Sequence, residues 1–315
     1  MTKLISATSF GPESTTYVWC RPLARFYSLA SGLKDHYEMS STSDLRPGEV
    51  HIDDDRFITG DLRRVKMDQH TWSEKGPIWG VDQCINQINT ILEFYRFLLK
   101  NYEQPFWLFG HTLTSIVHWP SILRLIETLP CEQIFAGKPL VLANHFHAQT
   151  IRIPSVGTGP YMLGMSGAGI LMSSDLISKI LERKDFCTHH VPSDVWLSAV
   201  LSDIPKIPLA RRDLSVSEAE AESLLSIISS SNFVESEISR GNFHFRVNSL
   251  TKLSNPNDRH HIDPNILLAL ACKLLSVRTV SNLHREAGLE EAAGFLKYFR
   301  KNADSTYGSE FIAQK

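Results

Sequence analysis

The 315-residue sequence lacks a long hydrophobic run, a strong charge excess and a paired-cysteine motif. No window approaches the roughly 18 consecutive apolar residues of a membrane span, and the opening apolar stretch is too short for a signal-peptide core, so we expect a cytoplasmic protein. A net charge of -2 argues against nucleic acid or an anionic membrane as the main partner. The five scattered cysteines are more typical of reduced thiols than of a disulfide framework or a zinc ribbon.

Several catalytic motifs are also missing. There is no GxxxxGK[ST] loop and no GxGxxG, so NTPase and dinucleotide-binding functions lack the loop that cradles phosphates. No GxSxG elbow supports a catalytic serine. The stretch Cys187-Thr188-His189-His190 has no second half with metal-ligand spacing, so the ligands of any metal stay unknown.

What the sequence does contain is an alternation of helix and strand patterns. With 43% hydrophobic residues the chain can bury a sizeable core. Apolar residues at helical spacing predict an amphipathic helix over Val81–Tyr102, and the following PFWLFG, apolar on both faces, predicts a strand inside a parallel or mixed sheet. Further strands are expected at 3–10, 49–58, 133–142, 206–213 and 241–249, and further helices at 118–130, 173–183, 192–204 and within 213–232. This alternation predicts an α/β fold with a largely parallel sheet.

The chain divides into two parts by pattern. Residues 1–250 carry the alternating elements, whereas residues 251–315 hold helical segments such as PNILLALACKLL and EEAAGFLKYFRKN. The apolar faces of these segments need a surface to cover. We therefore expect a helical C-terminal extension that packs on the first part.

An acidic cluster, Asp53-Asp54-Asp55, lies within the segment 49–58, where a strand is expected to run into an acidic loop. Consecutive carboxylates are suited to hold Mg²⁺ or Mn²⁺ beside a phosphate, because hard cations prefer oxygen ligands. Charge runs are also common in solvated loops. Both interpretations stay open.

A small-residue turn made of Ser166, Gly167, Ala168 and Gly169 precedes an apolar run and a helix. Glycine permits close backbone approach and unusual dihedral angles. The turn therefore lets either two structural elements touch or a ligand lie against the main chain.

Two later motifs carry groups suited to chemistry. Ser193 is suited to start a helix, and Asp194 falls in its first turn, where the helix dipole favours a carboxylate. Asp194 is either a helix-start residue or a base at the rim of a pocket. On the strand FHFRV, His244 and Arg246 share a face and could contact a diphosphate, although such residues are also common on solvated strands.

A series of segments resembles, in order, the second half of the fringe and β-1,3-glycosyltransferase type of GT-A glycosyltransferases. The segments are PFWLFGHTLTSIVHWPSILRLIETLP, IFAG, SGAGILMSSDLI, PSDVWLSAVL and FHFRV, and they cover about Pro105 to Val247. The resemblance implies a GT-A-like fold, with a mixed, mostly parallel sheet flanked by helices. It also implies a hexosyltransferase-like enzyme that moves a sugar from a nucleotide-sugar donor to an acceptor hydroxyl with inversion. The acceptor would be a glycan or a lipid-linked molecule, for example in bacterial surface polysaccharide synthesis.

The resemblance also implies roles for individual residues. The turn Ser166–Gly169 matches the family's glycine-rich turn, which lies against donor and acceptor. Asp194 matches the aspartate of the DDV motif and would be the general base. His244 matches a late histidine that helps to bind metal or diphosphate, and Arg246 joins it as a diphosphate contact by its place on the same strand face.

One departure concerns the family's DxD metal motif. Its place is taken by the stretch 111–115, HTLTS, which holds no carboxylate. TLTS is similar to an NLSS-like stretch in some bacterial sequences that look related, so Thr114 and Ser115 are expected among the substrate-binding residues. The charge on the departing nucleoside diphosphate would be neutralised either by Mn²⁺ or Mg²⁺, or by fixed groups such as His244 and Arg246.

Two other functions stay open. The missing DxD motif favours a non-catalytic nucleotide- or sugar-binding protein on the same fold. A further alternative is an enzyme of another class, such as a phosphate-ester hydrolase, that uses Asp53–Asp55 as a metal site.

Overall fold

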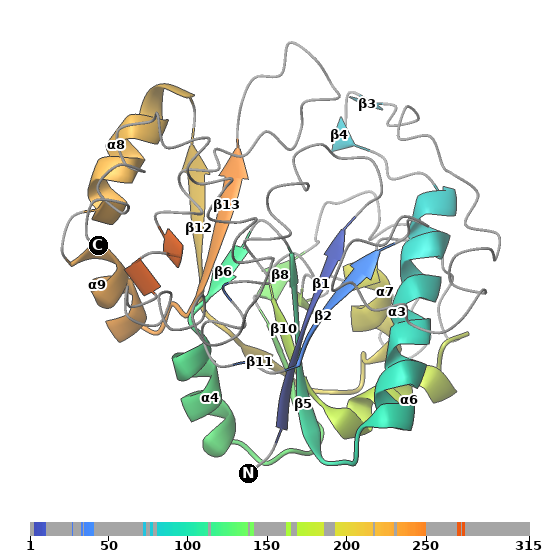
Figure 1. Cartoon of the computed structure of the whole chain (residues 1–315). Coiled ribbons are helices and arrows are strands. Elements are labelled where there is room, and N and C mark those ends of the chain that lie inside the picture. Colours follow the sequence, from blue (N-terminus) through green and yellow to red (C-terminus); the bar gives the residue numbers. More distant parts are fainter. Residues whose placement is uncertain are drawn as a thin grey trace, which may run out of the picture.

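A computed structural model shows a six-stranded sheet with helices on both faces (Figure 1). The structure describes residues 3–10, 27, 33, 35–40, 72–73, 76–77, 81–112, 115–137, 139–141, 162–164, 169–185, 193–216, 218–229, 232–249, 270–271 and 273–274. Within these residues, no helix is long and apolar enough to cross a membrane.

The six-stranded sheet is mixed and mostly parallel. Its strands, in spatial order, are β11 (Lys206–Pro208), β7 (Phe135–Gly137), β10 (Ile170–Ser173), β5 (Phe106–Thr112), β1 (Lys3–Phe10) and β2 (His36–Ser40). Strand β10 is antiparallel to both of its neighbours, and the other strand pairs are parallel. The α/β prediction with a mostly parallel sheet is therefore confirmed.

A second sheet and several helices surround the first. The helices are α3 (Val81–Asn101), α4 (Trp119–Glu127), α6 (Ser174–Glu182), α7 (Ser193–Val200), α8 (Glu218–Ser229) and α9 (Phe233–Ser239). The second sheet has the order β12 (Arg211–Val216), β13 (His244–Ser249) and β6 (Ser115–Val117). Two short antiparallel pairs complete the described strands, β3 (Trp72–Ser73) with β4 (Gly76–Pro77), and β8 (Pro139–Val141) with β9 (Met162–Gly164).

The main sheet is apolar on both faces because both are covered. Trp107 and Phe109 of β5 pack on the side of α4, where the rings of Phe109 and Trp119 meet edge to face at 5.4 Å. On the opposite face, Phe106 and Leu108 join a second core cluster with side chains of α3, α6 and α7. Burial on two faces explains why the sequence of this strand is a continuous apolar run.

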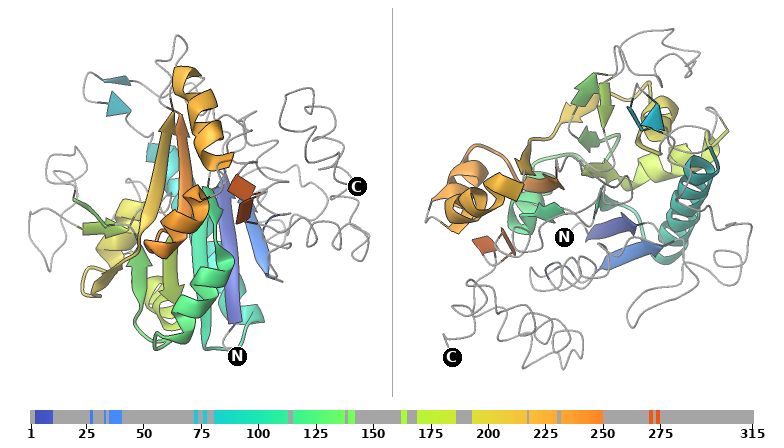
Figure 2. Two further views of the ribbon diagram at one scale, coloured as in Figure 1. Left: turned by 90° about the vertical axis from the view of Figure 1, so that its left-hand side faces the viewer. Right: turned by 90° about the horizontal axis from the view of Figure 1, so that it is seen from above.

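The second sheet lies between the main sheet and the helices α8 and α9 (Figures 1 and 2). Leu214, Phe245 and Val247 belong to the same core cluster as Leu225 and Ile228 of α8. Alternate residues of a strand point to opposite faces. Ser115, His244 and Arg246 therefore share the other face of this sheet, which we call the inner face; it faces the main sheet.

Most predicted elements are confirmed, and two are divided differently. The segment 133–142, expected as a strand and turn, forms β7 of the main sheet and β8, which pairs with β9. The segment 206–213, expected as one strand, forms the end-to-end strands β11 and β12, which belong to different sheets. The link between them is held where the N–H of Leu209 donates to the carbonyl of Gly137 at 2.8 Å. Helix α9 was not expected, since Ser229 and its neighbours indicated only a link after α8. The predicted strand at 49–58 lies outside the described residues.

A small part of the predicted C-terminal extension is described. Leu270 and Ala271 are helical, buried and part of the core cluster that includes α4 and β13. These two residues therefore pack against the first part of the chain, as the prediction of an added helical layer requires. The division near residue 250 stays a prediction.

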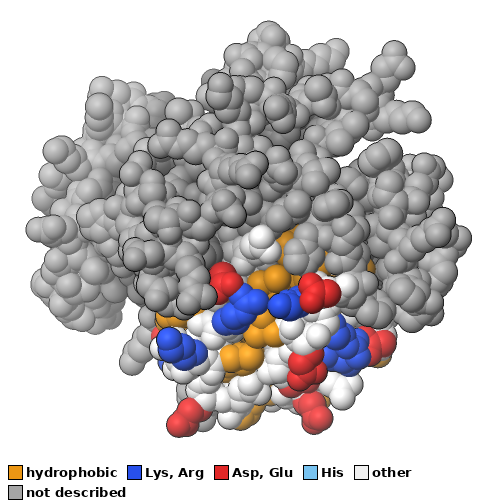
Figure 3. All heavy atoms as spheres, turned by 90° about the vertical axis from the view of Figure 1, so that its right-hand side faces the viewer, with side chains coloured by type: hydrophobic (Ala, Val, Ile, Leu, Met, Phe, Trp, Pro, Cys, Tyr) orange, Lys and Arg blue, Asp and Glu red, His pale blue; other side chains and the backbone are white. Residues whose placement is uncertain are grey.

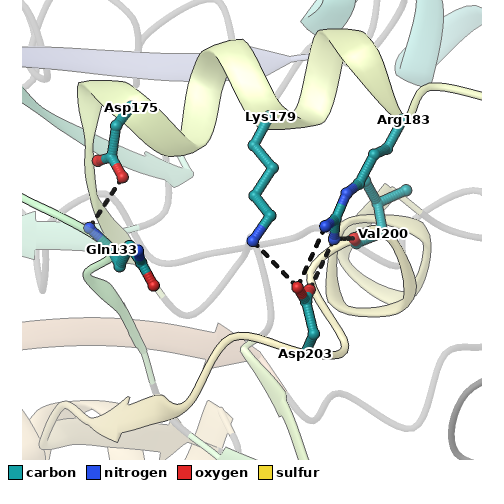
Figure 4. A network of polar contacts seen from close by, with 6 residues as sticks. All are labelled: Gln133, Asp175, Lys179, Arg183, Val200 and Asp203. Atoms are coloured by element: carbon teal, nitrogen blue, oxygen red, sulfur yellow. Dashed lines mark hydrogen bonds and ion pairs between the residues drawn. The ribbon is translucent and has the colours of Figure 1, made fainter.

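The outer side of α6 is joined to its surroundings by polar contacts (Figure 4). Lys179 and Arg183 contact the carboxylate of Asp203 at 3.0 and 2.7 Å, and hydrogen bonding from Arg183 holds the pKa of Asp203 at about 2. Asp203 is 44% exposed and its two partners are partly exposed, so the pairs stabilise the fold by only about 0–1 kcal/mol each. On this side of the molecule, acidic and basic side chains lie around a hydrophobic strip (Figure 3).

Candidate functional site

The carboxyl ends of β1 and β5 lie where the connections of the main sheet diverge. The chain passes from β1 to β2 on one side, and then crosses to β5 on the other side of β1. In open α/β sheets, ligands bind outside the carboxyl ends of strands at such a point. The side chains at this edge are therefore the first candidates for a site.

A buried polar cluster occupies this edge. The hydroxyl of Ser6 lies 2.9 Å from Nδ1 of His36 and 3.3 Å from Nε2 of His111. The Nδ1 of His111 lies 3.1 Å from the carbonyl oxygen of Thr112, and the hydroxyl of Ser115 donates to the same carbonyl at 2.8 Å. One arrangement satisfies these contacts: His111 donates from Nδ1 to the carbonyl, and Nε2 accepts from Ser6. The cluster thus links four strands of two sheets, β1, β2 and β5 of the main sheet and β6 of the second.

His111 is electrically neutral in this cluster. Burial lowers its pKa to about 4, although the backbone hydrogen bond to Thr112 acts in the opposite direction. Its ring also meets Trp119 edge to face at 5.5 Å. His111, at the position where the sequence resemblance leads one to expect metal-binding carboxylates, is therefore a neutral hydrogen-bonding group.

A small cavity connects this edge with the start of α7. Its volume is about 40 Å³, room for no more than one or two water molecules. Aromatic side chains of α3, including Phe94 and Tyr95, line it together with Gly110 and His111 at the end of β5. Ser193, the first residue of α7, lines the same cavity and is 3% exposed. The end of β5 and the start of α7 are thus neighbours.

Asp194 lies in the first turn of α7, as the sequence predicted. Its side chain is half-buried, and it follows Ser193 at the cavity. The helix start favours negative charge at this position. Asp194 is thus one residue beyond the lining of the cavity that joins the start of α7 to the end of β5.

Gly169 and His244 come from distant parts of the sequence and are in close contact. Gly169 has φ +83°, and a Cβ placed on it would lie 2.7 Å from Nδ1 of His244 and 2.9 Å from Cζ of Phe109. The absence of a side chain at Gly169 therefore lets the start of β10 and the start of β13 touch. Ser166, Gly167 and Ala168 lie outside the described residues.

His244 and Arg246 share the inner face of the second sheet, as expected. His244 is fully buried, and its ring meets Phe109 edge to face at 6.0 Å. Arg246 is half-buried and is the register partner of Ser115 in β6. Neither residue thus lies on a fully solvated strand, and Arg246 is adjacent to the polar cluster. Thr114 lies outside the described residues.

An ion pair on β12 was missed by the sequence reasoning. Arg211 and Asp213 are the register partners of His244 and Arg246 on β13. Nε of Arg211 lies 2.8 Å from Oδ1 of Asp213, and Nη2 donates to Oδ2 at 3.0 Å. Only the pairing of β12 with β13 puts this pair on the inner face. In the sequence, the charged residues 211–213 indicated nothing beyond a strand.

The described residues contain no group of three His, Cys, Asp or Glu side chains that could hold a metal ion. Asp53–Asp55 and the paired histidines at 145–147, 189–190 and 260–261 lie outside the described part of the chain. Binding of Mn²⁺ or Mg²⁺ by this chain stays a prediction.

No protein-family model matches the chain, and no curated protein matches it in sequence. The likeness to glycosyltransferases therefore depends on the short segments given above, and its implications for function are proposals.

A glycine series tests the contact between Gly169 and His244. Gly169→Ala should lower the free energy of unfolding by about 3 kcal/mol, because the positive φ and the collision with His244 both oppose a side chain. Gly241→Ala, which has φ +86° but open space, should lower it by about 1 kcal/mol. Gly110→Ala, which has open space and no such φ, should change it by less than about 1 kcal/mol. Denaturant titration measures all three, and equal effects of the first and third substitutions would contradict the contact.

The neutrality of His111 predicts a dependence of stability on pH. Its folded-state pKa of about 4 lies below the ordinary 6.5, so only the unfolded chain takes up this proton between those values. His111 should therefore make the free energy of unfolding fall as pH drops from 6.5 to 4, by up to about 1.4 kcal/mol per pH unit, and its own contribution should not fall further below pH 4. His111→Gln should flatten that part of the profile, while the other histidines titrate in both proteins. Parallel profiles for the two proteins would refute a depressed pKa.

Proposed function

We propose that the protein is a GT-A-like glycosyltransferase that moves a sugar from a nucleotide-sugar donor to an acceptor hydroxyl with inversion. One observation carries the proposal: predicted site residues from distant segments lie around the carboxyl end of β5. Ser115 is the register partner of Arg246, His244 contacts Gly169, and Asp194 follows a residue that shares a cavity with His111. Such convergence at a diverging edge is typical of a ligand site.

The sheet arrangement supports the proposed fold. In the main sheet, β10 alone runs against the other strands, between β5 and β7. The resemblance implies a mixed, mostly parallel sheet of this kind flanked by helices, and the described elements agree with it. Sheet topology supports the fold class, and the chemistry is argued from the site.

Asp194 is the proposed general base. In an inverting transfer the acceptor oxygen forms a bond to the sugar carbon while the bond from that carbon to the diphosphate breaks. The acceptor proton passes to the carboxylate. The first turn of α7 favours the charged carboxylate that this step requires.

The remaining residues bind donor and leaving group in this proposal. The turn Ser166–Gly169 lies against the sugar, and Thr114 and Ser115 contact substrate. Arg246 and His244 contact the diphosphate. Because His111 is neutral and buried, positive charge for the leaving group comes from Arg246 or from a bound Mn²⁺ or Mg²⁺.

A non-catalytic nucleotide- or sugar-binding protein is the second candidate. It is favoured by the sequence at the end of β5, which has His111 and Thr112 where the resemblance implies metal-binding carboxylates. Such a protein would keep the donor site and lack turnover.

Donor binding is the first test. UDP, GDP, CMP and their common sugar conjugates, each with Mn²⁺ and with EDTA, should raise the melting temperature in one nucleotide class only. A ligand at a hundred times its Kd stabilises the folded state by about 2.7 kcal/mol. Stabilisation that persists in EDTA would support fixed positive groups, whereas stabilisation only with Mn²⁺ would indicate a metal site. The absence of any shift would contradict the proposal.

Replacement of the base is the second test. With the donor so identified, Asp194→Asn should reduce nucleoside diphosphate release about 10² to 10⁴ fold, because the amide cannot accept the acceptor proton. The melting temperature and donor affinity should change little. Asp185→Asn, at an exposed position after α6, is the matched control and should keep full activity. Full activity of the Asp194 variant would refute the base assignment. If the unmodified protein binds the donor but shows no turnover, the binding-protein alternative would stand.

A further inference from the structure

Arg211 is a buried cation on the inner face of the second sheet. Its side chain is 7% exposed, and its carboxylate partner Asp213 is 26% exposed. A buried charge is costly unless it is paired and its hydrogen-bonding groups are satisfied. The ion pair with Asp213 meets the first requirement.

The ion pair occupies one edge of the Arg211 guanidinium, and a second edge makes no contact with Asp213. Asp213 contacts the Nε and Nη2 side of Arg211 in a two-point arrangement. The Nη1 of Arg211 is buried and has no hydrogen-bond partner among the described residues. Arginine carries five N–H donors in a planar fork, so the edge formed by Nη1 and Nη2 is suited to a second anion. Asp213 is then the residue that orients the guanidinium.

The position of Arg211 relates this edge to the candidate site. Its register partner His244 is in contact with Gly169, and Arg246 is the register partner of both Asp213 and Ser115. Two guanidinium groups thus stand beside one carboxylate on a single face of the sheet. The buried and unpartnered Nη1 of Arg211 therefore lies on the same sheet face as Arg246.

We propose that Arg211 binds a phosphate group of the donor's diphosphate through Nη1 and Nη2, with Arg246 beside it and Asp213 as a positioning residue. This inference rests on the proposed function and adds to it a residue that binds the leaving group. Planar two-point contacts are the usual way in which arginine binds phosphate. Charge on the departing diphosphate is then balanced by the second sheet, without a metal ion.

Binding of inorganic pyrophosphate in EDTA, measured by isothermal titration calorimetry, tests the site directly. The unmodified protein should bind it, and Arg211→Gln should weaken binding at least tenfold. Arg212→Gln is the matched control, because Arg212 lies on the opposite face of the same strand, is 49% exposed and pairs with Glu237. Its affinity should stay within twofold of the unmodified protein.

A second variant covers the case in which Arg211→Gln does not fold. Arg211→Lys keeps the positive charge beside Asp213 but cannot contact a carboxylate and a phosphate at two points each, so binding should weaken severalfold in a protein that still melts cooperatively. No pyrophosphate binding by the unmodified protein, or equal binding by the Lys variant, would overturn the inference. Pyrophosphate binding that depends on Arg211, in a protein that transfers no sugar, would support the anion site and contradict the transferase proposal. Sugar transfer that is unchanged in the Arg211 variants would support the transferase proposal and contradict the anion site.

Discussion

Strand β5 is packed on both faces, with Trp107 and Phe109 on the side of α4, and with Phe106 and Leu108 on the side of α3 and α6. Each such side chain stabilises the fold by roughly 1.5–3 kcal/mol through removal of apolar surface from water. Because side chains alternate between faces, a shift of one residue would move each of them to the opposite face, into a core cluster packed around different side chains. The two-sided packing therefore fixes the register of β5 against β1 and β10.

That register also determines where the polar groups lie. The chain leaves the apolar core at Gly110, and the next residue, His111, meets the hydroxyl of Ser6 from the neighbouring strand. The link to β6 then brings Ser115 back to the carbonyl of Thr112. Stability and site are thus coupled, since the same strand supplies the centre of the core and the first polar residues beyond it.

The sequence predicted the elements whose pattern is local and strong. Helix α3 and strand β5 were recognisable because their apolar residues follow the period of the helix or fill both faces of a strand. The separation of β11 from β12 was not recognisable in the sequence, because it depends on pairing with β7 and β13, which lie far away in the chain. Short α9 had no distinct periodicity. The same limit applies to the candidate site: the place of Asp194 in the first turn of a helix was predicted from the sequence, whereas the pair of Arg211 and Asp213 becomes visible only through the register of β13.

The contact between Gly169 and His244 means that two sheets share a fixed amount of space at one point. The imidazole fills the volume that any side chain at position 169 would need. The two positions are therefore not free to vary separately: a bulkier group before β10 requires a smaller one at the start of β13, in addition to a backbone that tolerates φ +83°. In a set of related sequences, that requirement would appear as correlated change in side-chain volume between two residues that are distant in the chain.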